Sequence, residues 1–240
     1  MEPNYLTINQ AANLLNVSID TLRRWDKKGK LKAVRRKEDG YRYYPKEIID
    51  LYLKDIFALA KQWVVELPAL PKPEFYCPDS LVFKIRLSRL ENDLSKIDEI
   101  KQIFSLISAV VGEIGNNSYD HNLGNWPDIR GIFFAYDLNK KQIVLADRGQ
   151  GILKTLRKVK PELKNDAEAL DVAFTKIISS RAPEARGNGL KFVRQVISEN
   201  PFDLEFYSGA AKLHIKQGLK NLHVKTSDTS YSGCITLIKF

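Results

Sequence analysis

A carboxylate and an amide that could share one metal-dependent reaction lie near the end of an apolar stretch. Glu113 and Asn117 are four residues apart in the segment EIGNNSYD. If this stretch is helical, both side chains project from the same face, one turn apart. An amide carbonyl can bind Mg²⁺, and a carboxylate beside it can position water next to the ion. Glu113 is therefore the candidate general base and Asn117 the candidate magnesium ligand.

A second motif, Asp147-Arg-Gly149-Gln-Gly151-Ile152, directly follows an apolar run that is typical of a strand. Its glycines let the backbone turn sharply and come close to a ligand. Asp147 is placed to accept a hydrogen bond at the end of the strand. The motif therefore predicts a ligand-binding turn.

A third motif, Arg186-Gly187-Asn188-Gly189-Leu190, directly precedes an expected helix. Glycines at a helix N-terminus with a basic side chain nearby form an anion site from exposed amides and the helix dipole. Each motif alone is common in ordinary turns, whereas the three in this order favour nucleotide binding. A Rossmann site is excluded, since no G-x-G-x-x-G follows the first strand.

Together the three motifs resemble the ATP-binding domain of the GHKL superfamily, which gyrase, the large heat-shock chaperone, histidine kinases and MutL share. The resemblance implies that Asn117 coordinates magnesium and that Asp147 binds the adenine amine. It also implies that Gly187 and Gly189 belong to a lid that wraps the phosphates. In members that hydrolyse ATP, the residue that matches Glu113 is the base.

The resemblance covers residues 81–240 and extends to further positions. Asp120 matches an acid of the chaperone-like members, and Thr236 corresponds to the threonine that supports the adenine-binding aspartate. The other implied cofactor-binding positions are Gly149, Gly151, Ile152, Arg186, Asn188 and Leu190. ATP and Mg²⁺ are the expected cofactors, and slow Mg-dependent ATP hydrolysis is the expected reaction.

The positive charge of the chain is concentrated in one stretch. The chain has 38 Lys and Arg against 29 Asp and Glu, which gives a net charge of +9. Residues 21–46 hold eleven of the bases and three of the acids, and so carry eight of the nine excess charges. A block this local in an otherwise balanced chain points to a polyanion.

Residues 5–53 resemble the winged helix-turn-helix of the mercury-resistance-regulator and excisionase group, through YLTINQAANLLNVSIDTLRRWDKKGKL and GYRYY. In such modules the second helix enters the major groove, while the wing holds phosphates or the minor groove of double-stranded DNA. The implied contacts in the second helix are Ser18, Asp20, Thr21, Arg23 and Arg24. Those in the wing are Arg35, Arg36, Lys37, Arg42 and Tyr43. Trp25 is expected in the core, and binding as a homodimer on paired half-sites is expected.

Short elements must position these DNA contacts. Thr7 and Ser18 can cap two helices, and Gly29 can stop the second. Two β-capable runs around the turn residues 38–40 predict a two-stranded wing. One helix is expected over residues 45–65, either as the place where two copies pair or docked on the ATP-binding domain.

Four prolines between Pro68 and Pro78 predict a linker. The expected domains are therefore a winged helix-turn-helix at 1–57, a helix end and linker at 58–80, and the ATP-binding domain at 81–240.

The second domain is expected to be built from long helices and a largely antiparallel sheet. Expected strands are 81–88, 131–137, 142–147, 203–209, 212–217, 221–226 and 234–240, and expected helices are 91–121, 167–178 and 190–200. Helices on one face of such a sheet make an α/β two-layer sandwich, here of the Bergerat type. The fold class of the whole chain is then α+β.

Composition excludes several other classes. The apolar content of 44% suits globular domains, and no run is long enough for a membrane-spanning helix. The start MEPNYLTINQ lacks the layout of a signal peptide, so a cytoplasmic protein with no membrane partner is expected. Cys77 and Cys234 are far apart, so neither a disulfide framework nor a zinc site is expected.

The use of ATP is left open by the sequence. The leading hypothesis is a DNA-binding regulator controlled by ATP, in which Glu113 acts on water. The alternative is an anti-sigma-like serine kinase or switch that acts on a small partner protein. A third is a mobile-element or phage-defence component, because excisionase-like modules also occur in recombination systems. A self-contained histidine kinase is disfavoured, since residues 45–80 contain no histidine and His121 is expected to be structural.

Overall fold

The chain forms two compact units in its computed structural model, Met1–Leu59 and Ala60–Phe240. The structure describes residues 5–15, 17–35, 40–53, 55–66, 68–176 and 189–240. The expected domain boundaries stay a prediction, because a division into two units does not test whether residues 58–80 act as a linker. None of the described helices has the length and hydropathy that crossing a bilayer requires.

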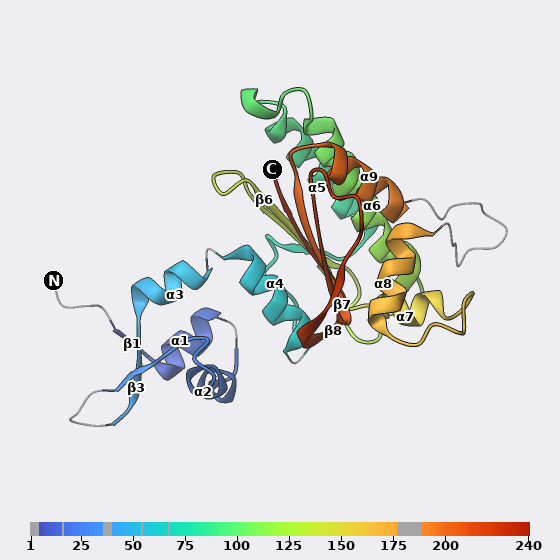
Figure 1. The fold of residues 1–240 in the computed structure, drawn as a ribbon. Coiled ribbons are helices and arrows are strands. Elements are labelled where there is room, and N and C mark those ends of the chain that lie inside the picture. Colours follow the sequence, from blue (N-terminus) through green and yellow to red (C-terminus); the bar gives the residue numbers. More distant parts are fainter. Residues whose placement is uncertain (1–4, 16, 36–39, 54, 67, 177–188) are drawn as a thin grey trace. The chain divides into compact units, whose positions relative to one another are not determined.

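The described part of the first unit has a small sheet, three whole helices and the start of a fourth, α4, which runs over Ile56–Val65 (Figure 1). Its elements are β1 (Tyr5–Thr7), α1 (Ile8–Leu15), α2 (Ile19–Lys27), β2 (Val34–Arg35), β3 (Arg42–Pro45) and α3 (Lys46–Leu53). The strands are antiparallel in the order β1-β3-β2. The expected wing strands are confirmed, and β1 is an addition that the sequence did not indicate. Of the expected wing turn, Glu38 and Asp39 lie outside the described residues.

Local capping sets the ends of the first two helices. Thr7 Oγ1 accepts the Gln10 N–H at 3.3 Å, and Gln10 Oε1 accepts the Thr7 N–H at 2.8 Å, which makes a capping box. Ser18 Oγ accepts the Thr21 N–H at 3.1 Å and caps α2. Gly29 follows α2 with a φ of +72°, a conformation that glycine adopts without strain. These contacts confirm the predicted helix-turn-helix layout.

The core of the first unit fixes α2 against the wing. It contains Ala11, Ala12, Leu15, Leu22, Trp25, Leu31, Tyr44 and Ile49. The Tyr44 hydroxyl donates to the Leu22 carbonyl at 3.3 Å, so β3 is bonded directly to α2. Trp25 is 3% exposed, which confirms its predicted place in the core.

The single helix expected over residues 45–65 is wrong, because two helices occupy this range: α3 and α4 (Ile56–Val65). Asp55 makes the break. Its carboxylate accepts the backbone N–H groups of Phe57 and Ala58 at 3.1 and 3.0 Å, and so caps α4. The apolar pattern continues across the break, which is why the sequence pattern conceals it.

The second unit is built on a five-stranded sheet in the order β4-β5-β6-β8-β7, with every neighbouring pair antiparallel. The strands are β4 (Tyr76–Cys77), β5 (Ile132–Asp137), β6 (Gln142–Asp147), β7 (Asp203–Lys216) and β8 (Val224–Lys239). The helices that follow the end of α4 are α5 (Ser80–Leu94), η1 (Asp98–Ile100, a 3-10 turn), α6 (Phe104–Asn122), α7 (Gly151–Leu156), α8 (Asp166–Thr175) and α9 (Gly189–Glu199).

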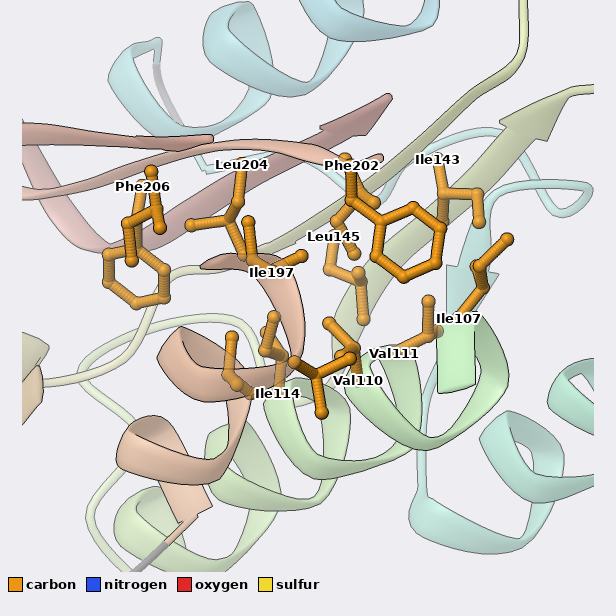
Figure 2. Close-up of a cluster of buried hydrophobic side chains, with 14 of the residues drawn as sticks. Ile107, Val110, Val111, Ile114, Ile143, Leu145, Ile197, Phe202, Leu204 and Phe206 are labelled. Carbon is orange, nitrogen blue, oxygen red and sulfur yellow. The ribbon is translucent and has the colours of Figure 1, made fainter. Parts of the chain in front are cut away.

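The main core of this unit lies between α6, α9 and one face of the sheet. Figure 2 shows Val110, Val111 and Ile114 of α6 facing Leu145 of β6 and Ile197 of α9. All five side chains are buried, as continuous apolar contact between a helical layer and a sheet requires. This arrangement confirms the predicted α/β two-layer sandwich and, with the first unit, the α+β fold class.

The C-terminal half of α4 packs on the other face of this sheet. The ring centroid of Trp63 lies 6.3 Å from that of Phe133 in β5. Phe133 alternates with Ile132 and Phe134, whose side chains belong to the main core, so it points away from that core. This contact lies within the second unit, so the two roles expected for the helix over 45–65 stay predictions.

Residues 81–88 form the start of α5, and the strand expected there is wrong. Asp79 accepts the backbone N–H groups of Leu81 and Val82 at 3.0 and 2.9 Å and begins the helix. A Cβ built on Gly115 of α6 would lie 2.1 Å from the Phe83 ring, so only glycine allows this close packing of α5 on α6. The packing of α5 on α6 therefore explains why Gly115, a residue type that disfavours helices, lies within α6.

Two further expectations about element length need correction. The helix expected over 91–121 is the end of α5, the turn η1 and α6, with Ile100 of η1 buried in the core. The four strands expected after residue 203 are the two long strands β7 and β8. A register shift around Gly209, where φ is +57°, bends β7 without ending it.

Candidate functional site

Asp147 ends β6 as a buried carboxylate with fixed partners. Its side chain accepts the Ser118 hydroxyl of α6 at 2.8 Å on Oδ2 and the Gly149 N–H at 2.8 Å on Oδ1. The residue is 2% exposed. Thr236 of β8, 1% exposed, is the register partner of Leu145, two residues before Asp147. The strand end therefore presents one oriented carboxylate, as the sequence predicted.

Burial raises the pKa of Asp147 to about 6, against the lowering effect of the hydrogen bonds from Ser118, Gly149 and Cys234. The folded chain therefore keeps a proton that the unfolded chain releases between pH 3.8, the ordinary pKa, and about 6. The free energy of unfolding contributed by this group falls as the pH rises through that window, and it is constant above it. The site holds a charged carboxylate at neutral pH at a cost in stability.

Ligand affinity should follow the ionisation of Asp147. If the ionised carboxylate accepts the adenine amine, adenosine should bind about tenfold more weakly at about pH 5 than at about pH 7, because roughly a tenth of the sites are then ionised. Calorimetry with adenosine measures this without a phosphate that also titrates. Affinity that is constant over this range would contradict the assignment of Asp147.

Asn122 at the end of α6 holds the turn that follows Asp147. Its Oδ1 accepts the Gln150 N–H at 2.8 Å, and its Nδ2 donates to the Ser118 carbonyl at 2.8 Å. A Cβ built on Gly149 would lie 2.0 Å from the Asn122 amide. Gly149 is therefore required for close contact with α6 rather than for an unusual backbone angle.

Ser208 of β7 holds the other side of the turn. Its hydroxyl accepts the Ile152 N–H at 3.0 Å and donates to the Gly233 carbonyl at 3.0 Å. Gly151 has a φ of +74°, so it is the glycine of this motif that the backbone conformation demands. A Cβ on Gly233 would lie 2.6 Å from Asp147 Oδ1. The strand β8 thus supplies a glycine that makes room for the carboxylate.

Glu113 and Asn117 lie one turn apart on α6 and are bonded to each other. Asn117 Nδ2 donates to Glu113 Oε1 at 3.2 Å. A carboxylate can only accept, so the amide nitrogen faces Glu113 and the amide oxygen is directed elsewhere. A Cβ on Gly189, the first residue of α9, would lie 1.7 Å from Glu113 Oε1. The structure therefore brings the first motif together with the last described glycine of the third.

These residues fit a magnesium site completed by phosphate oxygens. The described residues contain no group of three or more His, Cys, Asp or Glu side chains able to hold a metal ion. Mg²⁺ is commonly held by one or two protein oxygens, water and substrate phosphates. One oriented amide oxygen at Asn117 beside the Glu113 carboxylate suits that arrangement.

The remaining predicted cofactor residues are placed unevenly. Ile152 and Leu190 are half-buried and pack against the main core, while Asp120 is exposed on α6. Arg186, Gly187 and Asn188 lie outside the described residues. Burial, and then Lys158, lower the pKa of His121. The roles of all these side chains toward a nucleotide stay predictions.

The predicted DNA contacts on α2 differ in exposure. Arg23 and Asp20 form an exposed ion pair at 2.8 Å. Thr21 is 8% exposed and its Oγ1 accepts the Ser18 hydroxyl at 3.0 Å, so Ser18 and Thr21 are engaged in the helix start. Arg24, in the second turn of α2, is exposed, and its Nη2 lies 3.5 Å from Thr21 Oγ1.

Asp26 joins the wing to α2. It accepts Arg42 Nε at 2.7 Å and the Ala33 N–H at 3.1 Å, and Arg35 Nη2 lies 3.8 Å away. Partial burial acts to raise the pKa of Asp26, but the bonds from Arg42 and Ala33 leave it below its ordinary value. Tyr43 is half-buried in β3, and Arg36 and Lys37 lie outside the described residues. Arg35 and Arg42 are thus positioned by one carboxylate.

Five residues that hold the two candidate sites in place are not among the predicted site residues: Ser118, Asn122, Ser208, Gly233 and Asp26. Ser118 and Asn122 share the four-residue spacing of Glu113 and Asn117, and this spacing in an apolar helix is a signal that could have identified them. For Ser208 and Gly233, position along a strand carried no comparable signal.

Two sequence comparisons each match a short part of the chain. Residues 7–44 match the model of the MerR family of regulatory proteins. A 57-residue segment is 40% identical to the type II methyltransferase M.Eco47II of Escherichia coli, which is 24% of this chain and 14% of that protein. The chain therefore spans about a seventh of this curated relative.

Two solved ATPase structures align with part of the chain. The 43K ATPase domain of Thermus thermophilus gyrase B aligns at 19% identity and a TM-score of 0.34, over 54% of this chain and 32% of that one. The topoisomerase IV ATP-binding domain of Francisella tularensis aligns at 15% identity and a TM-score of 0.34, over 60% of this chain and 40% of that one. Alignments this weak assign no function by themselves.

Proposed function

We propose that this chain is a DNA-binding regulator whose binding to DNA, or to a protein partner, is controlled by ATP and Mg²⁺ held in its second unit. The observation that carries the proposal is the buried, oriented carboxylate of Asp147. It is joined through α6 to the Glu113–Asn117 pair in the order that the ATP-binding resemblance implies. The match of residues 7–44 to MerR regulatory proteins supports the DNA-binding part.

Asp147 would select the base of the nucleotide. Ser118 donates to Oδ2 and Gly149 to Oδ1, the Cys234 backbone also donates to this carboxylate, and each carboxylate oxygen can accept more than one hydrogen bond. The exocyclic amine of adenine is a donor, whereas the corresponding carbonyl of guanine is an acceptor and would be repelled. Thr236, Gly149 and Gly151 would shape the surroundings of that contact.

Asn117 and Glu113 would act at the phosphate end. The Asn117 oxygen would hold the metal, and bound Mg²⁺ would neutralise phosphate charge. The Glu113 carboxylate would orient a water or a hydroxyl for attack and accept its proton. Because Gly189 lies against Glu113, movement of the start of α9 would displace this carboxylate.

The first unit would read DNA with α2 and hold it with the wing. Arg23 and Arg24 would face the base edges, while Arg35 and Arg42, positioned by Asp26, would hold phosphates. We further propose a homodimer on paired half-sites, as a module of this size makes few contacts.

The DNA-binding prediction is tested by two double variants of equal charge. Changing Arg23 and Arg24 to Ala should weaken binding to the selected target by at least about tenfold, because base contacts contribute roughly 1–3 kcal/mol each. Changing Lys84 and Lys101, exposed residues of the second unit, to Ala removes the same charge. This double variant should change the affinity for the target by less than about twofold. Fluorescence anisotropy with a duplex selected from a random pool measures both.

Equal weakening by the two double variants would mean that charge alone, rather than α2, accounts for binding. Failure of the full chain to select or bind any duplex would remove the DNA-binding part of the proposal. The salt dependence of the wild type gives the number of phosphate contacts in the same experiment.

A further inference from the structure

Arg148 lies between two residues of the candidate nucleotide site but points to a different part of the molecule. It is 5% exposed, and its guanidinium donates in two directions. Nε and Nη2 donate to Asp128 Oδ2 at 2.9 and 2.6 Å. Nη1 donates to the backbone carbonyls of Trp63 and Glu66. A buried arginine with this many partners costs much more to rearrange than a surface one.

The two carbonyls bonded to Arg148 are at the C-terminal end of α4. The last carbonyls of a helix have no partner within it, and a cation near them is stabilised by the helix dipole. Arg148 therefore caps α4. The Trp63 indole, which donates to the Ala69 carbonyl at 2.8 Å and packs on Phe133, anchors the same helix end to the sheet.

Asp128 keeps the guanidinium in place for this capping role. Partial burial acts to raise the pKa of Asp128, but the bonds from Arg148 and from the Ile129 N–H leave it below its ordinary value. The carboxylate thus stays charged and holds one edge of the guanidinium, while the other edge is left for α4. A planar group with donors on several edges can do this, and an ammonium group cannot.

The helix that Arg148 caps is also the helix in which the two units divide. α4 begins at Ile56, within the first unit, and ends at Val65, within the second. The backbone of Arg148 is continuous with Asp147 and Gly149, so a ligand that shifts this turn shifts the capping group as well. One turn therefore touches the candidate adenine site on one side and the connecting helix on the other.

We propose that Arg148 couples the nucleotide site to α4, so that ATP bound at Asp147 changes how firmly the end of α4 is held and thereby changes the DNA affinity of the first unit. This inference rests on the proposed function, and it assigns Arg148 as a positioning residue that need not touch the nucleotide. ATP should tighten the turn and stabilise the last turn of α4.

Hydrogen exchange on the full chain tests this inference without DNA. In the wild type, ATP with Mg²⁺ should slow exchange of the peptide 60–66 by at least about fivefold, the low end of ordinary coupling between sites. In Arg148→Lys the affinity for ATP should stay within about threefold of that of the wild type. ATP should then have almost no effect on exchange of this peptide or on DNA affinity. If Arg148→Lys does not fold, Asp128→Asn takes its place in the test. That variant should also reduce the slowing of exchange that ATP causes in the peptide 60–66.

The matched control is Arg157→Lys. Arg157 also donates to two backbone carbonyls, but these are the carbonyls of Leu163 and Lys164, at 2.9 and 3.0 Å, rather than those of α4. This variant should keep the full ATP effect on residues 60–66. Equal loss in Arg157→Lys, or a full effect in Arg148→Lys, would overturn the inference.

The wild type separates this inference from the proposed function. If ATP changes DNA affinity but leaves exchange of 60–66 unchanged, the coupling through Arg148 is wrong and the proposed function stands. If the wild type binds no ATP, the proposed function fails and the inference fails with it.

Discussion

Replacing Asp147 with asparagine is expected to abolish ATP binding, with a loss of at least about 100-fold in affinity, since charged hydrogen bonds contribute roughly 1.5–3 kcal/mol and an unmatched donor adds to the loss. The geometry sets the direction of the effect. Oδ1 accepts the Gly149 N–H, which cannot reverse, so the amide oxygen must take that position. The amide nitrogen then occupies the Oδ2 position, where it would meet the donating adenine amine.

Calorimetric titration with ATP and Mg²⁺ measures this loss. Asp137→Asn is the matched control, because Asp137 also ends a strand and accepts the backbone N–H groups of Asn139 and Lys140 in the following turn, both at 3.1 Å. It should bind ATP as the wild type does. Asp147→Asn should remain folded at neutral pH, since the variant no longer buries a charge. Unchanged affinity in a folded Asp147→Asn would show that adenine binds elsewhere.

Asn117→Ala should have the second largest effect, the loss of Mg-dependent ATP binding. We expect at least about 30-fold weaker binding with Mg²⁺, because the variant lacks the proposed metal ligand. With EDTA in place of Mg²⁺, the variant and the wild type should bind equally. The comparison isolates the metal, because contacts to adenine are the same in both arms.

Glu113→Gln is the control that separates binding from chemistry. A glutamine oxygen can still accept the Asn117 amide, so the orientation of Asn117 and the room beneath Gly189 are kept. ATP affinity should stay within about threefold, while single-turnover hydrolysis should fall at least about 100-fold, as for loss of a general base. Hydrolysis by the wild type should be slow, and many turnovers per second would contradict that expectation.

Hydrolysis and phosphate transfer by the wild type distinguish the two functions. If the wild type transfers phosphate to a small partner protein and hydrolyses nothing measurable, the serine kinase alternative is correct and Glu113 acts on a hydroxyl.

If Asn117→Ala binds ATP equally with and without Mg²⁺, and with wild-type affinity, the assignment of Asn117 as the metal ligand is wrong.

Local spacing accounts for the part of the site that the sequence predicted. Glu113 and Asn117 are four residues apart in a helix, and Asp147 and Gly149 are two apart at a strand end, so neighbours in sequence are neighbours in space. Ser118 and Asp147 are 29 residues apart, and Ile152 and Ser208 are 56 apart. Such pairs depend on how α6, β6 and β7 pack, which no local pattern records.

The errors in the fold have equally local causes. The alternating apolar residues of 81–88 fit a strand, but Asp79 caps a helix there, and burial of Phe83 against Gly115 settles the packing. The apolar run of 45–65 fits one helix, but α3 ends at Leu53 and Asp55 caps the start of a second helix, α4. In both cases a single capping carboxylate outweighs a periodic pattern that admits two structures.

Control of DNA binding by ATP is tested most directly by measuring the affinity of the full chain for its selected duplex. The measurement is made with saturating ATP and Mg²⁺ and again without nucleotide, at one salt concentration. If ATP controls DNA binding, the two dissociation constants should differ by at least about fivefold, the low end of coupling between linked sites, and Asp147→Asn should remove the difference. Equal dissociation constants for a wild type that calorimetry shows to be saturated with ATP would contradict it.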